Sequence, residues 1–444
     1  MPRAKSGTRR VILFAIASLF AVSLICPPQV WVSGASVHKP RRPPKQNSEN
    51  EERNLSHYKI EFALDIDARS FSGVETIHWI NTDDHPANMV LLHLYSNLRS
   101  PLPVPATPPD GNSTPASTLS DEPRLEITDI RPAAGEGTLQ YSLDDPETTL
   151  RVNLREPVPS GGSTDFAIKF KGTVPEIDPE ETGLLAHVIQ QVGAALRSER
   201  ETRRARDINF FCRGMMMMGT PFPLLAARDG GDWKRKVEPS IGDVLFSDVA
   251  DYDIVVTVPA DFTVFTSGRN VRQKATGNTV EHVFSGNNLR DFAIVAAKNL
   301  RMAERTVNGI QIRSVYVPEH EVVGMRVLNQ AADAVRVFTN RFGAVPLRSL
   351  CIIDAPMVAG LGSMEFSGLT AIASAFYVNF DSPQVKSLPE LIREQRSSVE
   401  DSLEWTVAHV VAHQWWGSAV GSDPQRSPVL DEALANYSAL LYYK

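Results

Sequence analysis

Residues 409–417 read His-Val-Val-Ala-His-Gln-Trp-Trp-Gly, and residues 430–437 read Leu-Asp-Glu-Ala-Leu-Ala-Asn-Tyr. The first stretch ends a segment whose apolar residues recur at helical spacing, and Ser397 and Glu400 fit a capping box at its start. The second stretch follows Ser427-Pro428, a pair that often opens a helix because proline suits the first helical position. The sequence therefore predicts two consecutive helices.

His409 and His413 lie four residues apart on the first of these helices. This spacing places both imidazoles on one face, about one turn apart, where they can share a metal ion. Such a pair also arises easily by chance, so by itself it is a weak signal. Glu432 on the second helix can supply a third ligand. Two histidines and a glutamate with an open fourth position are typical of a catalytic Zn²⁺ site, although this ligand set leaves cobalt and manganese as alternatives.

A second motif is Gly-Ser-Met-Glu-Phe at residues 362–366. Together with residues 409–417 and 430–437 it resembles the signature of the membrane alanyl aminopeptidase family of zinc metallopeptidases. These are gluzincins, and they include the leukotriene hydrolase relatives. The motifs of this family read His-Glu-x-Ala-His-Gln-Trp-Phe-Gly, Leu-Asn-Glu-Gly-Phe-Ala-x-Tyr and Gly-x-Met-Glu-Asn.

The resemblance implies that His409, His413 and Glu432 hold Zn²⁺. It also implies that Glu365, with Gly362 and Met364, binds the free α-amino group of a peptide. A carboxylate paired with an ammonium group would fix the register so that only the first peptide bond reaches the metal. The alternative is that Glu365 is a surface glutamate in a glycine-rich loop.

Two departures from the family pattern fall on residues to which the family assigns a role in catalysis or substrate binding. Val410 stands where the family has its catalytic glutamate, the general base, and a valine can neither accept nor donate a proton. Hydrolysis is therefore expected to be severely impaired, although metal binding does not require this side chain. Glu404 and Asp431 are the nearest carboxylates in the sequence, but neither holds the required helical position. Phe366 replaces the usual asparagine of the substrate-binding motif.

Before residue 300 the sequence is mainly β. From Tyr58 apolar residues alternate with polar ones, which is typical of half-buried strands. The predicted strands are 58–66, 74–80, 89–94, 125–130, 166–170, 252–258, 280–284 and 291–297. After residue 300 the pattern becomes helical, with a helix over 322–342 and a buried strand over 350–353. We expect an α+β protein with a β domain at 56–300 and a catalytic domain at 301–444. The resemblance implies that the first is saddle-like and the second an incomplete thermolysin-like domain.

The first 35 residues resemble an export signal. Basic residues precede an apolar run of about 15 residues from Val11 to Ile25, which is shorter than the roughly 20 that span a bilayer as a helix. We therefore expect a signal peptide at 1–35, an exported protein, and no stable membrane span after cleavage. Residues 36–55 are rich in proline and charge and are predicted to be a disordered linker.

Several further segments carry weaker predictions. Residues 101–120 have the composition of a low-complexity surface excursion, and the basic stretch 197–206 is typical of a solvated surface. The four methionines at 215–218 suit pliable packing under a loop, with a substrate-facing role as the alternative. Cys212 and Cys351 would remain after removal of the signal peptide, and a disulfide between them is one alternative.

The composition narrows the classes of partner. The 444 residues are 42% hydrophobic and 22% charged, which is ordinary for a globular protein, and the net charge of −7 argues against a nucleic-acid binder. The family resemblance implies peptides with a free N-terminus as substrates. Two alternatives stay open: a noncatalytic protein that binds zinc or peptides, and a β interaction module followed by decaying sequence.

The last residue, Lys444, lies twelve residues after Glu432. Members of the family continue with a transition-state-stabilising tyrosine and a helical subdomain, so we expect a catalytic domain truncated at its C-terminus. The helix from Pro428 would then leave its apolar face uncovered, including Leu430, Leu434, Tyr437 and Leu441.

Overall fold

The structure, a computed structural model, describes residues 55–98, 124–144, 147–196, 208–229, 232–237, 245–387, 390–424 and 426–444. The predicted signal peptide, the linker up to residue 54, the excursion at 101–120 and the basic stretch at 197–206 lie outside these residues. The chain from Ser56 to Lys444 forms one unit. None of the described helices combines the length and apolar composition needed to cross a bilayer.

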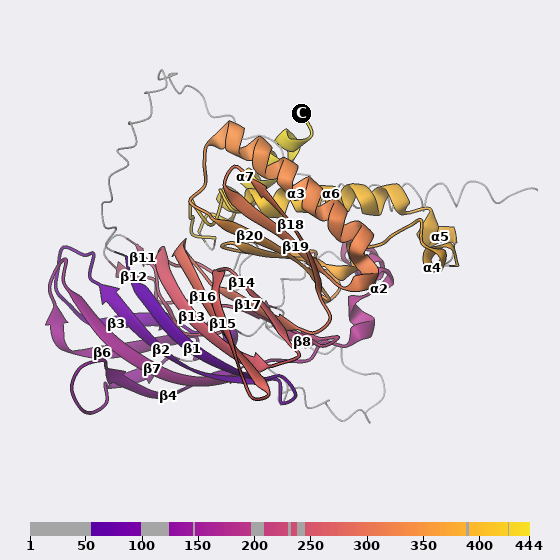
Figure 1. The fold of residues 1–444 in the computed structure, drawn as a ribbon. Coiled ribbons are helices and arrows are strands. Elements are labelled where there is room, and N and C mark those ends of the chain that lie inside the picture. Colours follow the sequence, from indigo (N-terminus) through magenta and orange to yellow (C-terminus); the bar gives the residue numbers. More distant parts are fainter. Residues whose placement is uncertain are drawn as a thin grey trace, which may run out of the picture. The chain divides into compact units, whose positions relative to one another are not determined.

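A seven-stranded sheet dominates the part before residue 300 (Figure 1). Its central strand β1 (His57–Asp65) buries every second side chain, as the alternation predicts. β1 pairs in parallel with β13 and antiparallel with β2. On one side of β1 lie, from the edge inward, β15 (Arg269–Thr276), β16 (Thr279–Leu289) and β13 (Ala250–Pro259). On the other side lie, from β1 outward, β2 (Ser70–Ile80), β7 (Ser163–Thr173) and β4 (Arg124–Pro132).

Two four-stranded sheets accompany it. One has the order β10 (Leu224–Leu225), β3 (Ala87–His93), β6 (Thr149–Val158) and β5 (Tyr141–Leu143). The other has the order β14 (Thr263–Thr266), β17 (Ala293–Ala297), β9 (Met215–Gly219) and β8 (Asn209–Cys212). The short strands β11 (Arg228–Asp229) and β12 (Asp232–Trp233) pair with each other.

Strand β9 corrects the prediction for the four methionines. Met215 to Met218 form an inner strand between β17 and β8, and none is more than 3% exposed. An unbroken apolar run suits a strand that is buried on both faces, so these side chains pack within the core rather than under a loop.

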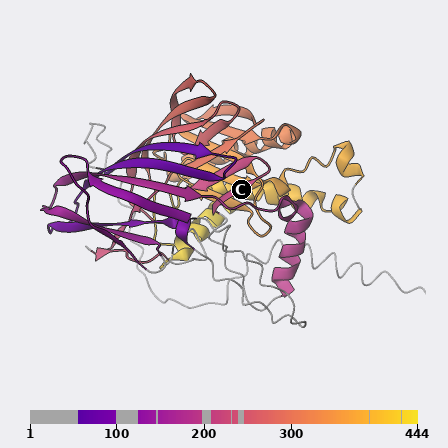
Figure 2. The same cartoon turned by 90° about the horizontal axis from the view of Figure 1, so that it is seen from below.

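The helix α2 (Leu184–Leu196) lies within the part that is predicted to be mainly β. Figure 2 shows it as the magenta helix apart from the purple strands.

Cys212 and Cys351 are both buried and free, so the disulfide that the sequence allows between them is not formed.

The part after residue 300 contains a five-stranded sheet with helices packed beside it (Figure 1). The sheet order is β18 (Arg301–Val307), β19 (Ile310–Tyr316), β20 (Ser349–Ala355), β22 (Leu369–Ala373) and β21 (Ser363–Phe366). The helices are α3 (Glu321–Phe342), α4 (Pro383–Lys386), α5 (Glu390–Arg393), α6 (Arg396–Ala412) and α7 (Pro428–Tyr442).

The predicted helices over 322–342 and from Pro428 are confirmed as α3 and α7. Helix α6 begins at Arg396 with Gln395 as its N-cap, and none of the side chains that the structure describes caps it. Glu400 pairs with Arg326 and Arg396, so the capping box predicted with Ser397 is wrong. The domain boundary at residue 300 and the saddle-like and thermolysin-like character of the two parts stay predictions.

Candidate metal centre

Helices α6 and α7 bring three candidate ligands together. His409 Nε2 and His413 Nε2 are 3.1 Å apart. Glu432 Oε2 lies 3.6 Å from His409 Nε2 and 4.0 Å from His413 Nε2. Two ligand atoms on one zinc ion can be at most about 4.2 Å apart, twice a bond of about 2.1 Å. All three separations fall within this limit, so the donor set fits a single cation.

His413 is held in the orientation that a ligand requires. Its side chain is 2% exposed, and its Nδ1 donates a hydrogen bond to the carbonyl oxygen of Trp416 at 3.1 Å. Because a carbonyl only accepts, this bond places the ring proton on Nδ1 and leaves the Nε2 lone pair facing His409 and Glu432. Gly417, with φ of +109°, makes the turn that follows Trp416, a conformation that favours glycine.

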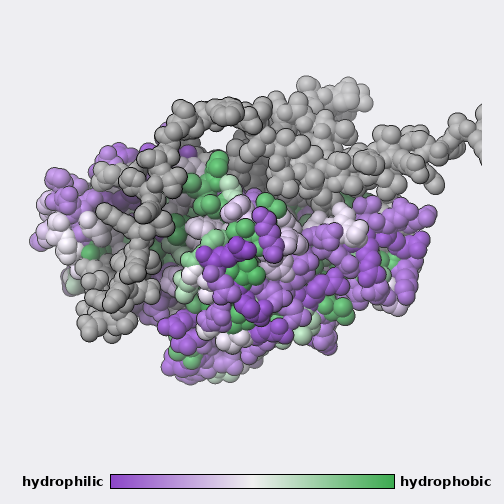
Figure 3. All heavy atoms as spheres, turned by 90° about the horizontal axis from the view of Figure 1, so that it is seen from above, coloured by the Kyte–Doolittle hydropathy of each residue, from purple (hydrophilic) through white to green (hydrophobic). Residues whose placement is uncertain are grey.

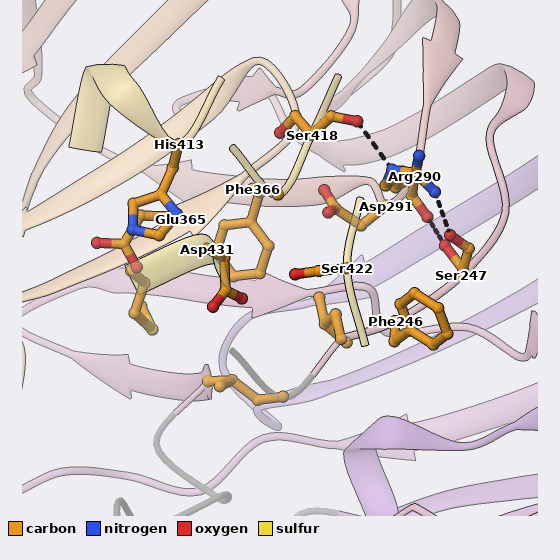
Figure 4. A pocket seen from close by; sticks show the side chains of 14 residues that line it. Phe246, Ser247, Arg290, Asp291, Glu365, Phe366, His413, Ser418, Ser422 and Asp431 are labelled. Carbon is orange, nitrogen blue, oxygen red and sulfur yellow. Dashed lines mark hydrogen bonds between the residues drawn. The ribbon is translucent and has the colours of Figure 1, made fainter. Parts of the chain in front are cut away.

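Glu365 approaches the same place from strand β21. Its carboxylate and the ring nitrogens of His409 and His413 lie within 4.8 Å of one another. Ser363 Oγ donates a hydrogen bond to Glu365 Oε1 at 2.5 Å. Figure 4 shows Glu365 beside His413 at one end of a cavity that both residues line. Of the predicted substrate-binding residues, Met364 is buried and also lines this cavity, whereas Gly362 lies just before the strand.

This architecture is similar to that of solved structures of M1 zinc metallopeptidase from Deinococcus radiodurans. The alignment with that enzyme has a TM-score of 0.51 and 17% identity, and it covers 87% of this chain and 69% of the other. A single-residue mutant of the same enzyme gives a TM-score of 0.52 at 17% identity, with 70% of its chain covered. The chain has the fold of an M1 zinc metallopeptidase. No protein-family model and no curated protein matches its sequence.

In this peptidase fold, position 410 faces the core. The side chain of Val410 is fully buried and belongs to the apolar cluster that includes Val407 and Val411. Glu404 accepts a hydrogen bond from Tyr442 at 3.0 Å, and Asp431 accepts one from the backbone of Glu432 at 2.8 Å. Asp431 is buried and lines the cavity beside Glu365 and His413.

Phe366 has a packing role in place of the family's asparagine. Its side chain is 4% exposed, and its ring fills the space that a Cβ on Gly219 would occupy, with ring atoms 2.6 Å from that position. Residue 366 therefore joins strand β21 to strand β9 and does not offer a polar side chain to the cavity.

Two residues that were not predicted to belong to the site, Arg290 and Asp291, follow strand β16 and line the far side of the cavity (Figure 4). Arg290 Nε donates to the carbonyl oxygen of Ser418 at 2.8 Å, and a second guanidinium nitrogen donates to that of Ser247 at 2.8 Å. Asp291 Oδ1 accepts from the backbone N–H of Ser367 at 2.7 Å. Burial raises the pKa of Asp291 to about 6, and the hydrogen bonds from Ser367 oppose this rise. Through Ser418 and Ser367, these contacts attach the segment after His413 and the segment after Glu365 to the residues that follow β16.

Gln414, the residue after His413, links its own segment directly to the turn that follows Glu365. Its amide nitrogen donates to the carbonyl oxygen of Phe366 at 3.1 Å, and its amide oxygen accepts from the N–H of Gly368 at 2.9 Å. Gln414 is 1% exposed, and it follows His413 directly as Phe366 follows Glu365. The hydrogen bond between Gln414 and Phe366 therefore helps to fix the position of His413 relative to Glu365, because each partner is the next residue in the chain.

Proposed function

We propose that this protein binds one Zn²⁺ ion through His409, His413 and Glu432 and captures peptides by their free N-terminus, with a low rate of hydrolysis. The proposal rests on one observation above all, the three donor atoms 3.1 to 4.0 Å apart. The M1 metallopeptidase fold supports it. The membrane alanyl aminopeptidase type, the exported location and the domains at 56–300 and 301–444 belong to the same proposal.

A bound zinc ion supplies Lewis acidity toward the carbonyl of a peptide bond. Glu365 would pair its carboxylate with the peptide's ammonium group and so place the first peptide bond near the metal ligands. The buried methyl groups of Val410 provide no proton acceptor for the attacking water. A positioned general base contributes about 10²- to 10⁴-fold in rate, and its loss accounts for slow cleavage.

The metal content of the purified protein tests the zinc proposal. We expect about one equivalent of zinc in the native protein, because three protein ligands converge on one point. His413→Ala should lose it, because this substitution removes a ligand. His57→Ala is the matched control: His57 lies on strand β1, where it pairs with Asp253. A native protein without stoichiometric zinc, or a His413→Ala protein that keeps it, would contradict the proposal.

A noncatalytic peptide-binding protein is the second candidate, and the burial of Val410 favours it. Such a protein would bind unblocked peptides with zinc present and release them uncut. Binding of a tripeptide and of its N-acetylated form, measured by calorimetry, identifies the role of the amine. Cleavage measured alongside separates a slow enzyme from a binding protein.

A further inference from the structure

We propose that Trp416 is a positioning residue that couples the two helices of the metal centre. Its main chain orients His413 at the C-terminal end of α6, and its side chain holds α7, the helix that carries Glu432. This inference rests on the proposed zinc site, and it assigns a role there to a residue that is not a ligand.

The main chain of Trp416 faces His413. Its carbonyl oxygen accepts the hydrogen bond from His413 Nδ1 at 3.1 Å and so directs Nε2 toward the other ligands. Two backbone hydrogen bonds hold the turn in which Trp416 lies. The N–H of Trp416 donates to the carbonyl oxygen of Ala412 at 3.0 Å, and the N–H of Ser418 donates to that of His413 at 3.1 Å. The turn itself therefore holds this carbonyl beside the imidazole.

The indole of Trp416 faces α7. Its Nε1 donates to Ser438 Oγ at 2.8 Å, and Ser438 Oγ donates in turn to the carbonyl oxygen of Leu434 at 2.7 Å. An indole N–H only donates and a carbonyl only accepts, so both bonds of the hydroxyl have a fixed direction. Ser438 is fully buried, and the ring of Phe342 packs edge-on against Trp416 with the ring centroids 5.2 Å apart. These bonds end on a carbonyl only two residues after Glu432.

The distance between the ligands shows why this coupling matters. His413 Nε2 and Glu432 Oε2 are 4.0 Å apart, the largest of the three separations and only about 0.2 Å below the roughly 4.2 Å limit for one zinc ion. Leu434 and Tyr437 on the outer face of α7 are exposed, so apolar packing restrains this helix mainly from the side of α6 and α3. A small outward shift of α7 would therefore take this pair of ligands out of reach of a shared ion first.

Zinc affinity tests the proposal. Trp416→Phe keeps an aromatic ring and removes the donor. In competition with a chromogenic chelator, it should bind zinc at least about tenfold more weakly than the native protein, since the loss of outer partners of metal ligands costs about 10- to 100-fold. Ser438→Ala removes the acceptor and should weaken binding equally, and the double variant should bind no more weakly than either single variant. An unchanged affinity in either single variant, or additive losses in the double variant, overturns the coupling. If Trp416→Phe fails to fold, Ser438→Ala alone decides.

Tyr442→Phe is the matched control. Tyr442 OH donates to Glu404 Oε1 at 3.0 Å, so this variant also loses one hydrogen bond between α7 and α6. The lost bond lies about 15 Å along the helix from Glu432. Tyr442→Phe should lower the denaturant midpoint of unfolding about as much as Trp416→Phe and should leave the zinc affinity unchanged. Equal losses of zinc affinity in the two variants would show that the indole acts through general stability alone.

Cobalt provides a spectroscopic readout. With Co²⁺ in place of zinc, Trp416→Phe and Ser438→Ala should change the visible absorption spectrum, because a shift of Glu432 relative to His413 alters the coordination geometry. Tyr442→Phe should keep the native spectrum. Native spectra in both Trp416→Phe and Ser438→Ala overturn the positioning role.

Failure of the zinc site gives a different result. If the native protein and His413→Ala bind zinc equally, the metal centre itself is wrong. If His413→Ala loses zinc while Trp416→Phe and Ser438→Ala match the native protein, the metal centre stands and Trp416 does not position it.

Discussion

Under the proposed function, Val410 is the residue that limits the rate of hydrolysis. Glutamate at this position should raise the rate of cleavage of aminoacyl chromogenic substrates about 100-fold or more in the zinc-loaded protein, because it restores a general base. The same substitution should lower the free energy of unfolding, because position 410 is fully buried. Val410→Gln is the matched control, with a similar size and no proton acceptor of comparable basicity. Equal rates for the native protein and Val410→Glu would show that the missing base does not limit the reaction.

Glu75 is a buried carboxylic acid in the seven-stranded sheet. It is 0% exposed, its two oxygens lack a hydrogen-bond partner among the described residues, and burial raises its pKa well above the usual value. The folded protein therefore keeps this proton above about pH 4.3, where the unfolded chain releases it. Its contribution to stability is complete below that pH and falls by about 1.4 kcal/mol per pH unit until the folded carboxyl also ionises.

Glu75→Gln should remove this pH dependence. Its free energy of unfolding, measured in denaturant between pH 5 and pH 8, should exceed that of the native protein by a margin that grows with pH. Glu61→Gln, on the exposed side of neighbouring β1, should follow the native curve. Parallel curves for native protein and Glu75→Gln would show that Glu75 ionises normally in the folded state.

Helix α7 turns small residues toward α6 and leaves several large apolar residues in solvent. Ala435, Ser438 and Ala439 are fully buried, and Trp416 Nε1 donates to Ser438 Oγ at 2.8 Å. The exposed apolar residues are Val429, Leu430, Leu434, Tyr437 and Leu440, at 36 to 69% exposure. Figure 3, seen from the side of the helices, shows green apolar side chains among hydrophilic ones. The predicted uncovered face is confirmed for Leu430, Leu434 and Tyr437, and is wrong for Leu441, which is buried.

Exchanging Leu434, Tyr437 and Leu440 together for glutamine should reduce the binding of a hydrophobic dye. The free energy of unfolding should change by no more than about 0.5 kcal/mol per site, because exposed side chains contribute little. Ala439→Leu should instead destabilise the protein by about 1 to 3 kcal/mol, because it overfills the contact with α6. A triple variant as unstable as Ala439→Leu would mean that this face is covered in solution.

The limits of sequence reasoning are clearest at the level of elements. His409 and His413 could be placed together because helical spacing is a local property, and Glu432 because a helix start was readable at Pro428. Arg290 escaped prediction because its partners Ser367 and Ser418 are 77 and 128 residues away, and no local pattern encodes such contacts. Met215 to Met218 were misread because an apolar run has the same pattern under a loop as in an inner strand.

At the scale of the whole molecule, the candidate metal centre depends on segments from both halves of the chain. Arg290 and Asp291 hold the segments after His413 and Glu365, and Lys234 pairs with Asp423 at 2.7 Å with both side chains largely buried. Residues 301–444 expressed alone should therefore bind zinc much more weakly than residues 56–444, and should show a weak near-ultraviolet circular dichroism spectrum. Full zinc affinity in the shorter protein would show that the centre assembles without these contacts.

The burial of strand β9 determines how this protein responds to oxidative damage over time. Thioethers are readily converted to sulfoxides by peroxide, but Met215 to Met218 are sealed inside a sheet and are at most 3% exposed. Oxidant can reach them only when the strand opens, and four polar sulfoxides would then prevent it from closing again. An opening during which these methionines are oxidised is therefore not reversed by refolding alone, and the mass of the peptide that contains them reports the fraction of molecules in which this has occurred.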